Sequence, residues 1–395
     1  MIDTFITKIH IDKVRYLAGF DILLSETERR HLILTGKNGS GKTSLLEAMR
    51  DYIVNHQFLD NRIQYNSNTP AAIQERRAIN QAYVRINLEA MDVSVDFYKH
   101  DNNLYDTTFA YLQAARSSLS VPKSIEPIES WGNTFILRNA SKDFLKFILN
   151  MYVQYLSAKD TGKTKMEIER YQAWFERFTQ ALRDIYGCQE LELKPDMKNL
   201  AFYIDMPERE PFQLHEMSDG YQAFLEIYME IIMRFNSDTE NGTVDYNKTA
   251  IVFIDEIETH LHVELQKRAL PFLTHMFPNV QFVVATHSPF VITSLPNAVV
   301  YDLEKHEQLD NPSFYSYEAV VESFLDADMY SDVMKQRFSR YKELCFKADK
   351  TKAENEEFLR TRTELELMSP ASKELFIAFR KLEQERKEAK IGQTD

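Results

Sequence analysis

One stretch, LILTGKNGSGKTSLLEAM at residues 32–49, restricts the fold of this chain more than any other. It reads as an apolar strand, a glycine-rich turn and the start of a helix, and the turn from Gly36 to Thr43 matches the pattern G-x-x-x-x-G-K-[ST]. Glycines in such a turn let successive backbone N–H groups converge on phosphate oxygens, and the helix N-terminus adds a positive potential. We therefore expect a phosphate-binding loop between a buried strand and a helix.

The residue types in this loop predict how a nucleotide and its metal ion are held. Lys42 is expected to reach the β- and γ-phosphates, and the hydroxyl of Thr43 is expected to ligate magnesium. The expected ligands are therefore ATP and Mg2+. The residues of this loop expected to contact the nucleotide are Gly36, Lys37, Asn38, Gly39, Ser40, Gly41, Lys42, Thr43 and Ser44.

Length and composition set limits on the whole chain. Its 395 residues, of which 44% are hydrophobic and 27% charged, are ordinary for a globular protein of one large domain or two or three smaller ones. We find no apolar run of about 18 residues or more, so no membrane span is expected. The N-terminus lacks an apolar signal segment, and Cys188 and Cys345 form no metal-binding or disulfide framework, which favours the cytoplasm. The net charge of −13 argues against coating of nucleic acid by bulk charge but allows a local basic patch.

A second motif, IVFIDEIETHLH at 251–262, places Asp255 and Glu256 at the end of an apolar strand. Asp255 is expected to hold magnesium through water, and Glu256 to polarise the water that attacks the phosphate. Two acids can also end a strand simply to keep it soluble. Their occurrence together with the phosphate-binding loop favours the catalytic interpretation.

Two further motifs carry candidate residues. VVATHSPF at 283–290 is another buried strand, and its end places His287 where it can meet the γ-phosphate. A lone histidine is more often structural, but its position just after the acidic strand favours a functional role. Ser218 and Gly220 lie in the first turn of a helix at MSDGYQ, a geometry that suits an anion although no phosphate of the same chain remains to be bound.

Hydrophobic periodicity predicts the surrounding elements. We expect buried parallel strands at AIVFIDE and VQFVVATHS, and an antiparallel meander beside the nucleotide fold. The other expected strands are 3–11, 20–24, 31–36, the three meander strands 82–90, 93–100 and 107–116, and the runs ELELKP and NLAFYIDM; a helix is expected at 44–54.

Residues 141–187 change to a helical period. Gly187 stands where a C-terminal cap belongs, and the apolar residues of this segment are interpreted as core: Ile168, Tyr171, Trp174, Phe178, Leu182 and Ile185. The C-terminal part is helical and highly charged, with a helix start at Ser369-Pro370 and an apolar stripe at Leu375, Phe376, Phe379 and Leu382. The predicted division is a nucleotide-binding part at 1–116, a helical insertion at 117–200, a second nucleotide-binding part at 201–305 and a helical extension at 306–395.

These motifs, in this order, resemble the non-transporter branch of the ABC-type ATPases, namely the RecF/SMC-like and OLD-type proteins. The resemblance is carried by LILTGKNGSGKTSLLEA, EMSDGYQAFLEIY, IVFIDEIETHLH and VVATHSPFVI. It implies an α/β P-loop NTPase fold of ABC type with an antiparallel side sheet, an inserted helical region and a helical C-terminal extension. It also implies that Ser218 and Gly220 contact the γ-phosphate bound to a second copy, so that two chains enclose two ATP molecules.

The resemblance further assigns roles to single residues. Asp255 takes the Walker B role, Glu256 that of the catalytic carboxylate and His287 that of the switch histidine. YLQAAR at 111–116 stands where the Q-loop is expected, which makes Gln113 a magnesium or water contact. ETHLHVELQ is similar to a stretch of the OLD-like proteins, so that His260 and His262 are expected to pack at a helix start rather than to bind a metal.

The departures from the family are also informative. The residues after 300 lack the EG motif that opens the nuclease domain of OLD proteins, so no intrinsic nuclease activity is expected. Residues 117–200 hold a short helical insertion instead of the long heptad arms of SMC proteins, so a clamp spanning long DNA distances is not expected.

Several functions remain open at this point. Stand-alone ATPases of this branch occur in bacterial anti-phage systems of the Septu, PARIS and retron types, where they are paired with a nuclease or toxin. The expected function is therefore ATP-dependent control of a separate effector by a dimer or higher oligomer. The alternative is a RecF-like DNA-repair ATPase, for which QERR at 74–77 and Arg50 could contribute a basic surface. A transporter subunit fits the insertion and the extension poorly, and intact Lys42, Glu256 and His287 argue against a relative without hydrolytic activity.

Overall fold

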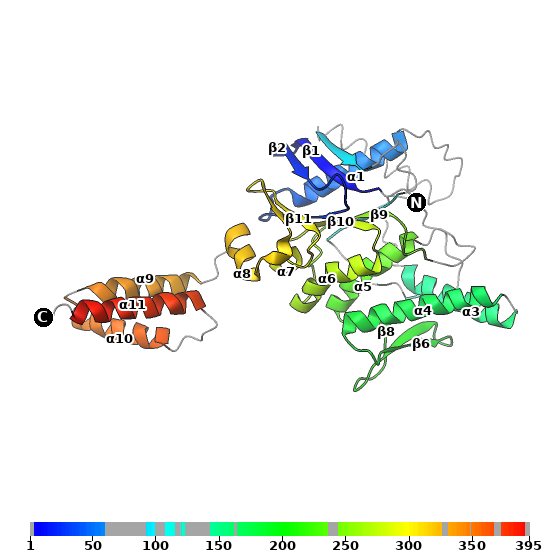
Figure 1. Cartoon of the computed structure of the whole chain (residues 1–395). Helices are drawn as coiled ribbons and strands as arrows, with labels where there is room; N and C mark the ends of the chain where they lie inside the picture. Colours follow the sequence, from blue (N-terminus) through cyan, green and yellow to red (C-terminus); the bar gives the residue numbers. More distant parts are fainter. Residues whose placement is uncertain are drawn as a thin grey trace. The chain divides into compact units, whose positions relative to one another are not determined.

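The computed structural model describes residues 4–59, 92–98, 107–114, 119, 121–122, 143–161, 164–235, 244–325, 331–347, 349–366 and 373–391. The chain divides into two compact units, Met1–Leu325 and Asp326–Asp395. Figure 1 shows the elements of each unit in sequence colours.

A six-stranded sheet with the order β12-β11-β3-β10-β9-β5 forms the centre of the first unit. The strands from β11 to β5 run parallel, and β12 is antiparallel to β11. All residues of the parallel strands are buried, which explains why their sequences are nearly continuous apolar runs. The strands are β3 (His31–Thr35), β5 (Thr108–Leu112), β9 (Ala250–Ile254), β10 (Val280–Ala285), β11 (Ala298–Asp302) and β12 (Glu307–Asp310).

A second, antiparallel sheet has the order β2-β1-β4, with β1 at Ile6–Val14, β2 at Leu17–Leu23 and β4 at Asp92–Phe97. The prediction of an antiparallel side sheet is thus confirmed, but its predicted membership is wrong at 107–116. That run contains β5, which pairs with β9 in parallel. Both faces of β5 are buried, so the apparent alternation of its sequence does not reflect one exposed face. The predicted strand at 82–90 lies outside the described residues.

The central sheet separates two hydrophobic cores. On one face, Leu34 and Phe253 pack with the side sheet and with helix α1 (Lys42–Leu59). On the other, Ile33 and Ile254 pack with α5 (Asp219–Phe235) and α6 (Val263–Met276). Figure 1 shows these layers, with α1 and the side sheet on the opposite side of the central sheet from α5 and α6. The expected α/β fold with a phosphate loop is confirmed.

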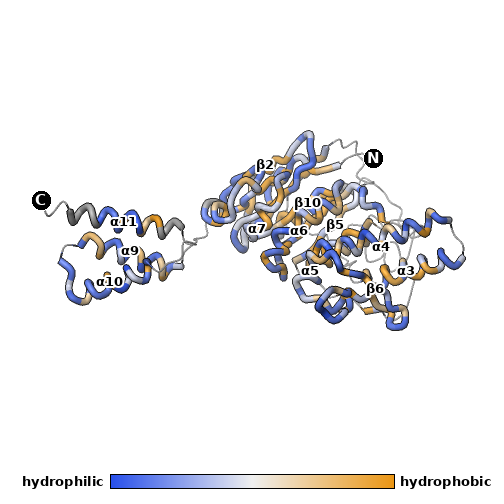
Figure 2. The backbone as a smooth tube through the Cα atoms, turned by 60° about the horizontal axis from the view of Figure 1, so that its bottom comes forward, coloured by the Kyte–Doolittle hydropathy of each residue, from blue (hydrophilic) through white to orange (hydrophobic). Residues whose placement is uncertain are grey.

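The helical region contains α3 (Phe144–Asp160) and α4 (Lys165–Tyr186). A capping box of Thr164 and Glu167 begins α4, and Gly187 ends it with a left-handed φ of 67°, as the sequence predicts. Apolar residues recur along α4 between hydrophilic ones (Figure 2). Of the six predicted core residues, Ile168 is half-buried and the others are buried: Tyr171, Trp174, Phe178, Leu182 and Ile185.

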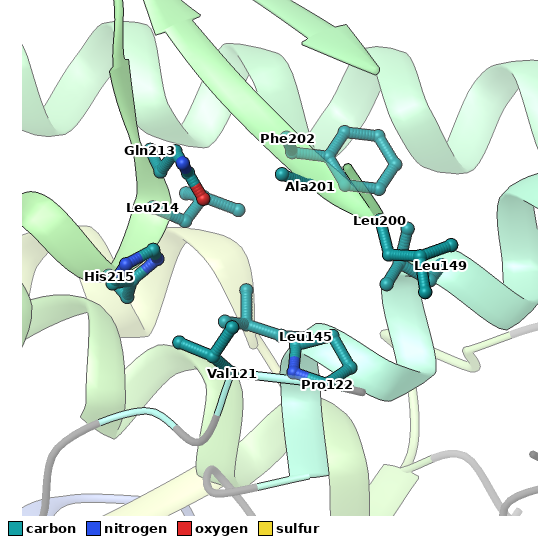
Figure 3. A pocket seen from close by; sticks show the side chains of 10 residues that line it. All are labelled: Val121, Pro122, Leu145, Leu149, Leu200, Ala201, Phe202, Gln213, Leu214 and His215. Carbon is teal, nitrogen blue, oxygen red and sulfur yellow. The ribbon is translucent and has the colours of Figure 1, made fainter. Parts of the chain in front are cut away.

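A small antiparallel sheet follows α4, with β6 at Glu192–Asp196, β7 at Ala201–Asp205 and β8 at Phe212–Gln213. A small open pocket lies between this sheet and α3, as Figure 3 shows. Part of its lining comes from the short helix η3 (Leu214–Glu216), which directly precedes the Ser218 motif. The lining residues are Val121, Pro122, Leu145, Leu149, Leu200, Ala201, Phe202, Gln213, Leu214 and His215.

The segment that leaves the central sheet contains α7 (Pro289–Ile292), η4 (Pro312–Phe314), α8 (Tyr317–Ala319) and the π-helix η5 (Val320–Phe324). The first unit therefore continues to Leu325, beyond the predicted start of the extension at 306, because β12 still pairs with β11. In the described part of the chain, no helix is long and apolar enough to cross a membrane.

The second unit consists of α9 (Asp332–Phe346), α10 (Lys352–Glu366) and α11 (Lys373–Ile391). Its own core contains Tyr341, Leu344, Cys345, Phe358, Leu365 and Phe379. Burial of Phe379 and Leu382 agrees with the predicted apolar stripe of the last helix. The predicted helix start at Ser369-Pro370 lies outside the described residues.

Candidate functional site

The candidate residues follow neighbouring strands of the central sheet. The parallel registers pair Leu34 with Ala285, and Ile254 with both Val284 and Leu112. The strands therefore end at one edge, and the segments that follow them meet there. The sequence-predicted residues of these segments are the loop from Gly36 to Ser44, Gln113, Asp255, Glu256 and His287.

The phosphate-binding loop depends on glycine at defined positions. Gly36 has a φ of 128°, and a Cβ atom there would lie 2.8 Å from the hydroxyl oxygen of Ser40. Gly41 has a φ of 92°, and its Cβ would lie 2.9 Å from a methyl carbon of Leu17 in the side sheet. L-residues rarely adopt these φ values, so the loop geometry requires glycine at both positions.

Lys42 lies inside this loop with 6% of its surface exposed. Its ammonium group donates to the carbonyl oxygens of Gly36 at 2.9 Å and Lys37 at 3.2 Å. Burial lowers the pKa of Lys42, while the carboxylates of Glu258 and Asp255 act against this shift. The site thus holds one buried cation at the point where a nucleotide phosphate would enter.

One buried polar atom in the loop fits a phosphate ligand. The hydroxyl oxygen of Ser40 has no hydrogen-bond partner among the described residues. Buried hydroxyl groups are normally satisfied, and a phosphate oxygen in the loop would satisfy this one. The residues present therefore fit a bound nucleotide.

Oxygen atoms of Thr43 and Asp255 form a candidate magnesium site. The Thr43 hydroxyl donates to one carboxylate oxygen of Asp255 at 2.9 Å. Burial raises the pKa of Asp255, and the bond from Thr43 opposes this shift. A hydroxyl and a carboxylate are ligands that Mg2+ prefers, so this pair fits the ion.

Glu256 follows Asp255 in an unusual backbone conformation. Its φ is 46°, a value uncommon outside glycine, and its side chain is half-buried. The hydroxyl of Thr259 donates to one of its carboxylate oxygens at 3.3 Å. The positive φ turns the chain at the end of β9.

His287 is half-buried at the end of β10. Burial lowers its pKa, the charge of Lys42 lowers it further, and the carboxylates of Glu258 and Glu256 raise it. The electrostatic influence of Lys42 on His287 is consistent with the predicted meeting of the two side chains at one site. With its pKa lowered, the imidazole is mainly neutral at pH 7.

Gln113 comes directly after β5 and is exposed. The backbone N–H of Asp255 donates to the carbonyl oxygen of Leu112 at 2.9 Å, which places Gln113 beside the acidic strand end. Its role as a magnesium or water contact stays a prediction.

Ser218 and Gly220 lie in a different environment. Ser218 is exposed just before α5, and in the described part of the chain no hydrogen bond or ion pair joins it to the phosphate-binding loop. Gly220 is buried, and a Cβ there would lie 3.0 Å from the carbonyl oxygen of His260 and 3.2 Å from the ring of His262. His262 is the N-cap residue of α6, and both His260 and His262 are exposed, so their role in packing stays a prediction.

Comparison with known families decides the assignment. Residues 32–293, which span the phosphate-binding loop, the Ser218 motif, the acidic strand and His287, match the family described as "AAA domain, putative AbiEii toxin, Type IV TA system". The chain belongs to this family.

Relatives of this AAA-domain chain include a Septu protein and a retron ATPase. The Septu protein PtuA of Bacillus mycoides is 23% identical over 316 residues, covering 77% of this chain and 41% of that protein. The "Retron Ec83 probable ATPase" of Escherichia coli is 32% identical over 97 residues, or 25% of this chain and 18% of that protein. The similarity to Septu and retron ATPases predicted from the sequence is confirmed. The chain matches less than half the length of each of these relatives.

Two solved structures resemble this AAA-domain chain in part. The SMC head domain from Thermotoga maritima is 14% identical and covers 75% of this chain and 94% of its own, with a TM-score of 0.37. An Smc head bound to the C-winged helix domain of ScpA is 12% identical and covers 79% of this chain and 100% of its own, with a TM-score of 0.39. The assignment of the fold rests on the strand order and the phosphate-binding loop rather than on these scores.

Sequence reasoning missed two residues of this AAA-domain site. Tyr16, at the turn between β1 and β2, is 62% exposed, and its hydroxyl donates to the carbonyl oxygen of Gly39. Glu258 contacts the segment that carries His287. An aromatic residue at a hairpin turn and a third acid after the strand were visible signals, but their contacts with the site depend on the tertiary fold.

Proposed function

We propose that this chain is an ATPase that encloses ATP as a dimer and thereby controls a separate effector protein. The observation that supports this most is the meeting of the phosphate-binding loop, the Thr43–Asp255 pair, Glu256 and His287 at one edge of the sheet. Family membership identifies the domain that carries these residues as an ATPase domain.

The proposed hydrolysis uses positioning and charge, without a covalent intermediate. Lys42 would bind the β- and γ-phosphates, and Thr43 and Asp255 would hold Mg2+. A bound magnesium ion would neutralise phosphate charge during the transfer. Glu256 polarises the attacking water, and His287 donates one hydrogen bond from a ring N–H to a γ-phosphate oxygen. Gln113 would contact the metal ion or the attacking water.

The proposed dimer explains the exposed Ser218. In the head-to-tail arrangement, Ser218 and Gly220 of one copy contact the γ-phosphate bound to the other. The exposure of Ser218 just before the long helix α5 supports this role. Completion of each site would then require two copies and ATP.

The proposed partner is a nuclease or toxin in bacterial anti-phage defence, acting in the cytoplasm. The names of the Septu and retron relatives support the defence role. The alternative, a DNA-repair ATPase, loses part of its sequence support because Arg50 is only 4% exposed and pairs with buried Asp51 at 2.6 Å. Residues 74–77, the other basic candidates, lie outside the described residues.

The decisive experiment compares wild-type protein with Glu256→Gln. Wild-type protein should hydrolyse ATP slowly in the presence of Mg2+, and Glu256→Gln should bind ATP, lose hydrolysis and elute as a dimer only with ATP. Light scattering coupled to gel filtration, with ADP as the control, measures the association. Hydrolysis by Glu256→Gln at the wild-type rate would refute the assignment of the base.

The effector is tested with the same variant. Glu256→Gln protein is recovered from its native cells with and without ATP and analysed for protein and DNA. A stoichiometric protein partner whose recovery requires ATP supports control of an effector. Recovery of DNA without a protein partner favours the repair alternative.

A further inference from the structure

Glu258 stands apart from the acids that the proposed mechanism uses. It lies in the turn that follows β9, two residues after Glu256, and its side chain is half-buried. The backbone N–H of His287 donates to one of its carboxylate oxygens at 2.6 Å, and the hydroxyl of Thr286 donates to the other at 2.7 Å. One carboxylate thus holds two consecutive residues at the end of the neighbouring strand.

These two bonds belong to a strong class. Hydrogen bonds to an ionised carboxylate are shorter and about twice as strong as neutral ones. The same Thr286 hydroxyl also accepts a hydrogen bond from the backbone N–H of Ser288 at 3.0 Å. Glu258 therefore contacts Thr286 and His287 directly and Ser288 through the Thr286 hydroxyl. The backbone N–H of Thr286 donates to the carbonyl oxygen of Leu34 at 3.0 Å, which ties the same segment to β3.

A second link joins the same two segments. The hydroxyl of Ser288 donates to the side-chain carbonyl of Gln266 at 2.6 Å, and the amide of Gln266 donates to the carbonyl oxygen of Leu261 at 2.8 Å. The turn after β9 is therefore linked to the segment after β10 twice: directly through Glu258, and through Gln266 of α6, which connects Leu261 with Ser288.

We propose that Glu258 is a positioning residue that fixes the backbone of His287, and so the direction of its imidazole, for contact with the γ-phosphate. In this proposal the two acids have different roles: Glu256 polarises the attacking water, and Glu258 positions His287. Both oxygens of Glu258 are engaged by protein donors, which suits a positioning role better than that of a base. This inference rests on the proposed ATPase function.

Electrostatics supports the same position. Among the carboxylates that favour the charged form of Lys42, Glu258 has the largest influence. Its charge also raises the pKa of His287 against the effect of burial. Glu258 therefore lies close enough to the phosphate site for its geometry to matter there.

The first test measures the backbone and needs no ATPase activity. Amide hydrogen exchange of residues 283–290 is compared between wild type, Glu258→Ala and Glu264→Gln. Loss of a charge-assisted bond should speed exchange at His287 by about tenfold or more in Glu258→Ala. Glu264→Gln, at an exposed acid paired with Lys267 on α6, should exchange like wild type. Unchanged exchange in Glu258→Ala would overturn the proposal.

The second test asks whether Glu258 acts through His287. Glu258→Gln, which keeps the shape of the side chain, should lower kcat by about tenfold while the Kd for ATP changes less than about twofold. In a His287→Ala background, Glu258→Gln should lower kcat no further, because residues that act as a unit are not additive. A full additional loss in the double variant would mean that Glu258 acts independently, and the proposal would fall.

The two tests separate the inference from the function on which it rests. A wild-type protein without ATPase activity but with faster exchange in Glu258→Ala would refute the proposed function and leave the backbone contact standing. Normal wild-type hydrolysis with unchanged exchange would refute the inference alone.

Discussion

Lys42 places a buried positive charge in the phosphate-binding loop. Its ammonium group is buried, bonded to two carbonyl oxygens of its own loop, and surrounded by acids that offset part of the cost of burial. A cation held in this way meets a phosphate in an environment of reduced dielectric, where the attraction is stronger than in water.

Lys42→Ala should therefore weaken ATP binding by at least about 100-fold, because truncation of one member of a buried charge pair costs several kcal/mol. Isothermal titration calorimetry with ATP and Mg2+ measures the change. Lys267→Ala, at a half-buried residue of α6 whose ammonium group pairs with Glu264, is the control and should bind like wild type. Binding within about threefold of wild type by Lys42→Ala would contradict the role of the ammonium group.

His31 makes a separate contribution at the first residue of β3. Its ring is buried, its Nδ1 accepts from the backbone N–H of Phe282 at 3.1 Å, and burial lowers its pKa from 6.5 to about 4. The unfolded state therefore binds a proton below about pH 6.5, where the folded state does not.

The free energy of unfolding should consequently be highest above about pH 6.5, and the lowered pKa of His31 should reduce it by about 3 kcal/mol as the pH decreases toward 4. Urea unfolding at several pH values between 7.5 and 4.5 measures this slope. In His31→Asn the difference between neutral and acid stability should shrink by that amount. An equally steep slope in His31→Asn would assign the acid sensitivity to other groups.

At the scale of elements, strands that are buried on both faces were the easiest to recognise as strands. The sheet to which each belongs, and its neighbours there, were the hardest to predict. Local sequence was enough to predict β9, β10 and the phosphate-binding loop, because the apolar runs and the glycine pattern involve only neighbouring residues. It was not enough for the position of β5, because Thr108–Leu112 pairs with a strand more than a hundred residues away, and its sequence resembles a side-sheet strand. Tyr16 and Glu258 were missed for the same reason: each acquires its role from a partner distant in sequence.

At the scale of the whole chain, two units have separate cores. The second unit has a cluster of its own among its described residues, which includes Tyr341, Phe358 and Phe379. Each core should therefore respond to its own mutations, since stability is not uniform across a structure.

Phe379→Ala should destabilise the second unit by about 3–5 kcal/mol and leave the unfolding of the first unit unchanged. Differential scanning calorimetry, with hydrogen exchange to assign each transition, measures this. Ile377→Ala, at a residue of the same helix that is 64% exposed, is the matched control and should leave both transitions in place. A common shift of both transitions in Phe379→Ala would show that the units unfold as one.

The glycine geometry of the phosphate-binding loop has a consequence for ligand selectivity. With Gly36 and Gly41 already at positive φ and Lys42 already seated, the loop is preorganised, so little ordering entropy remains to be lost when a ligand arrives. The free energy of binding then comes mainly from the phosphates, which exchange for the lysine's bonds to its own loop. Affinity should fall steeply from ATP to ADP to adenosine, and other nucleoside triphosphates should compete to the extent that their bases are tolerated.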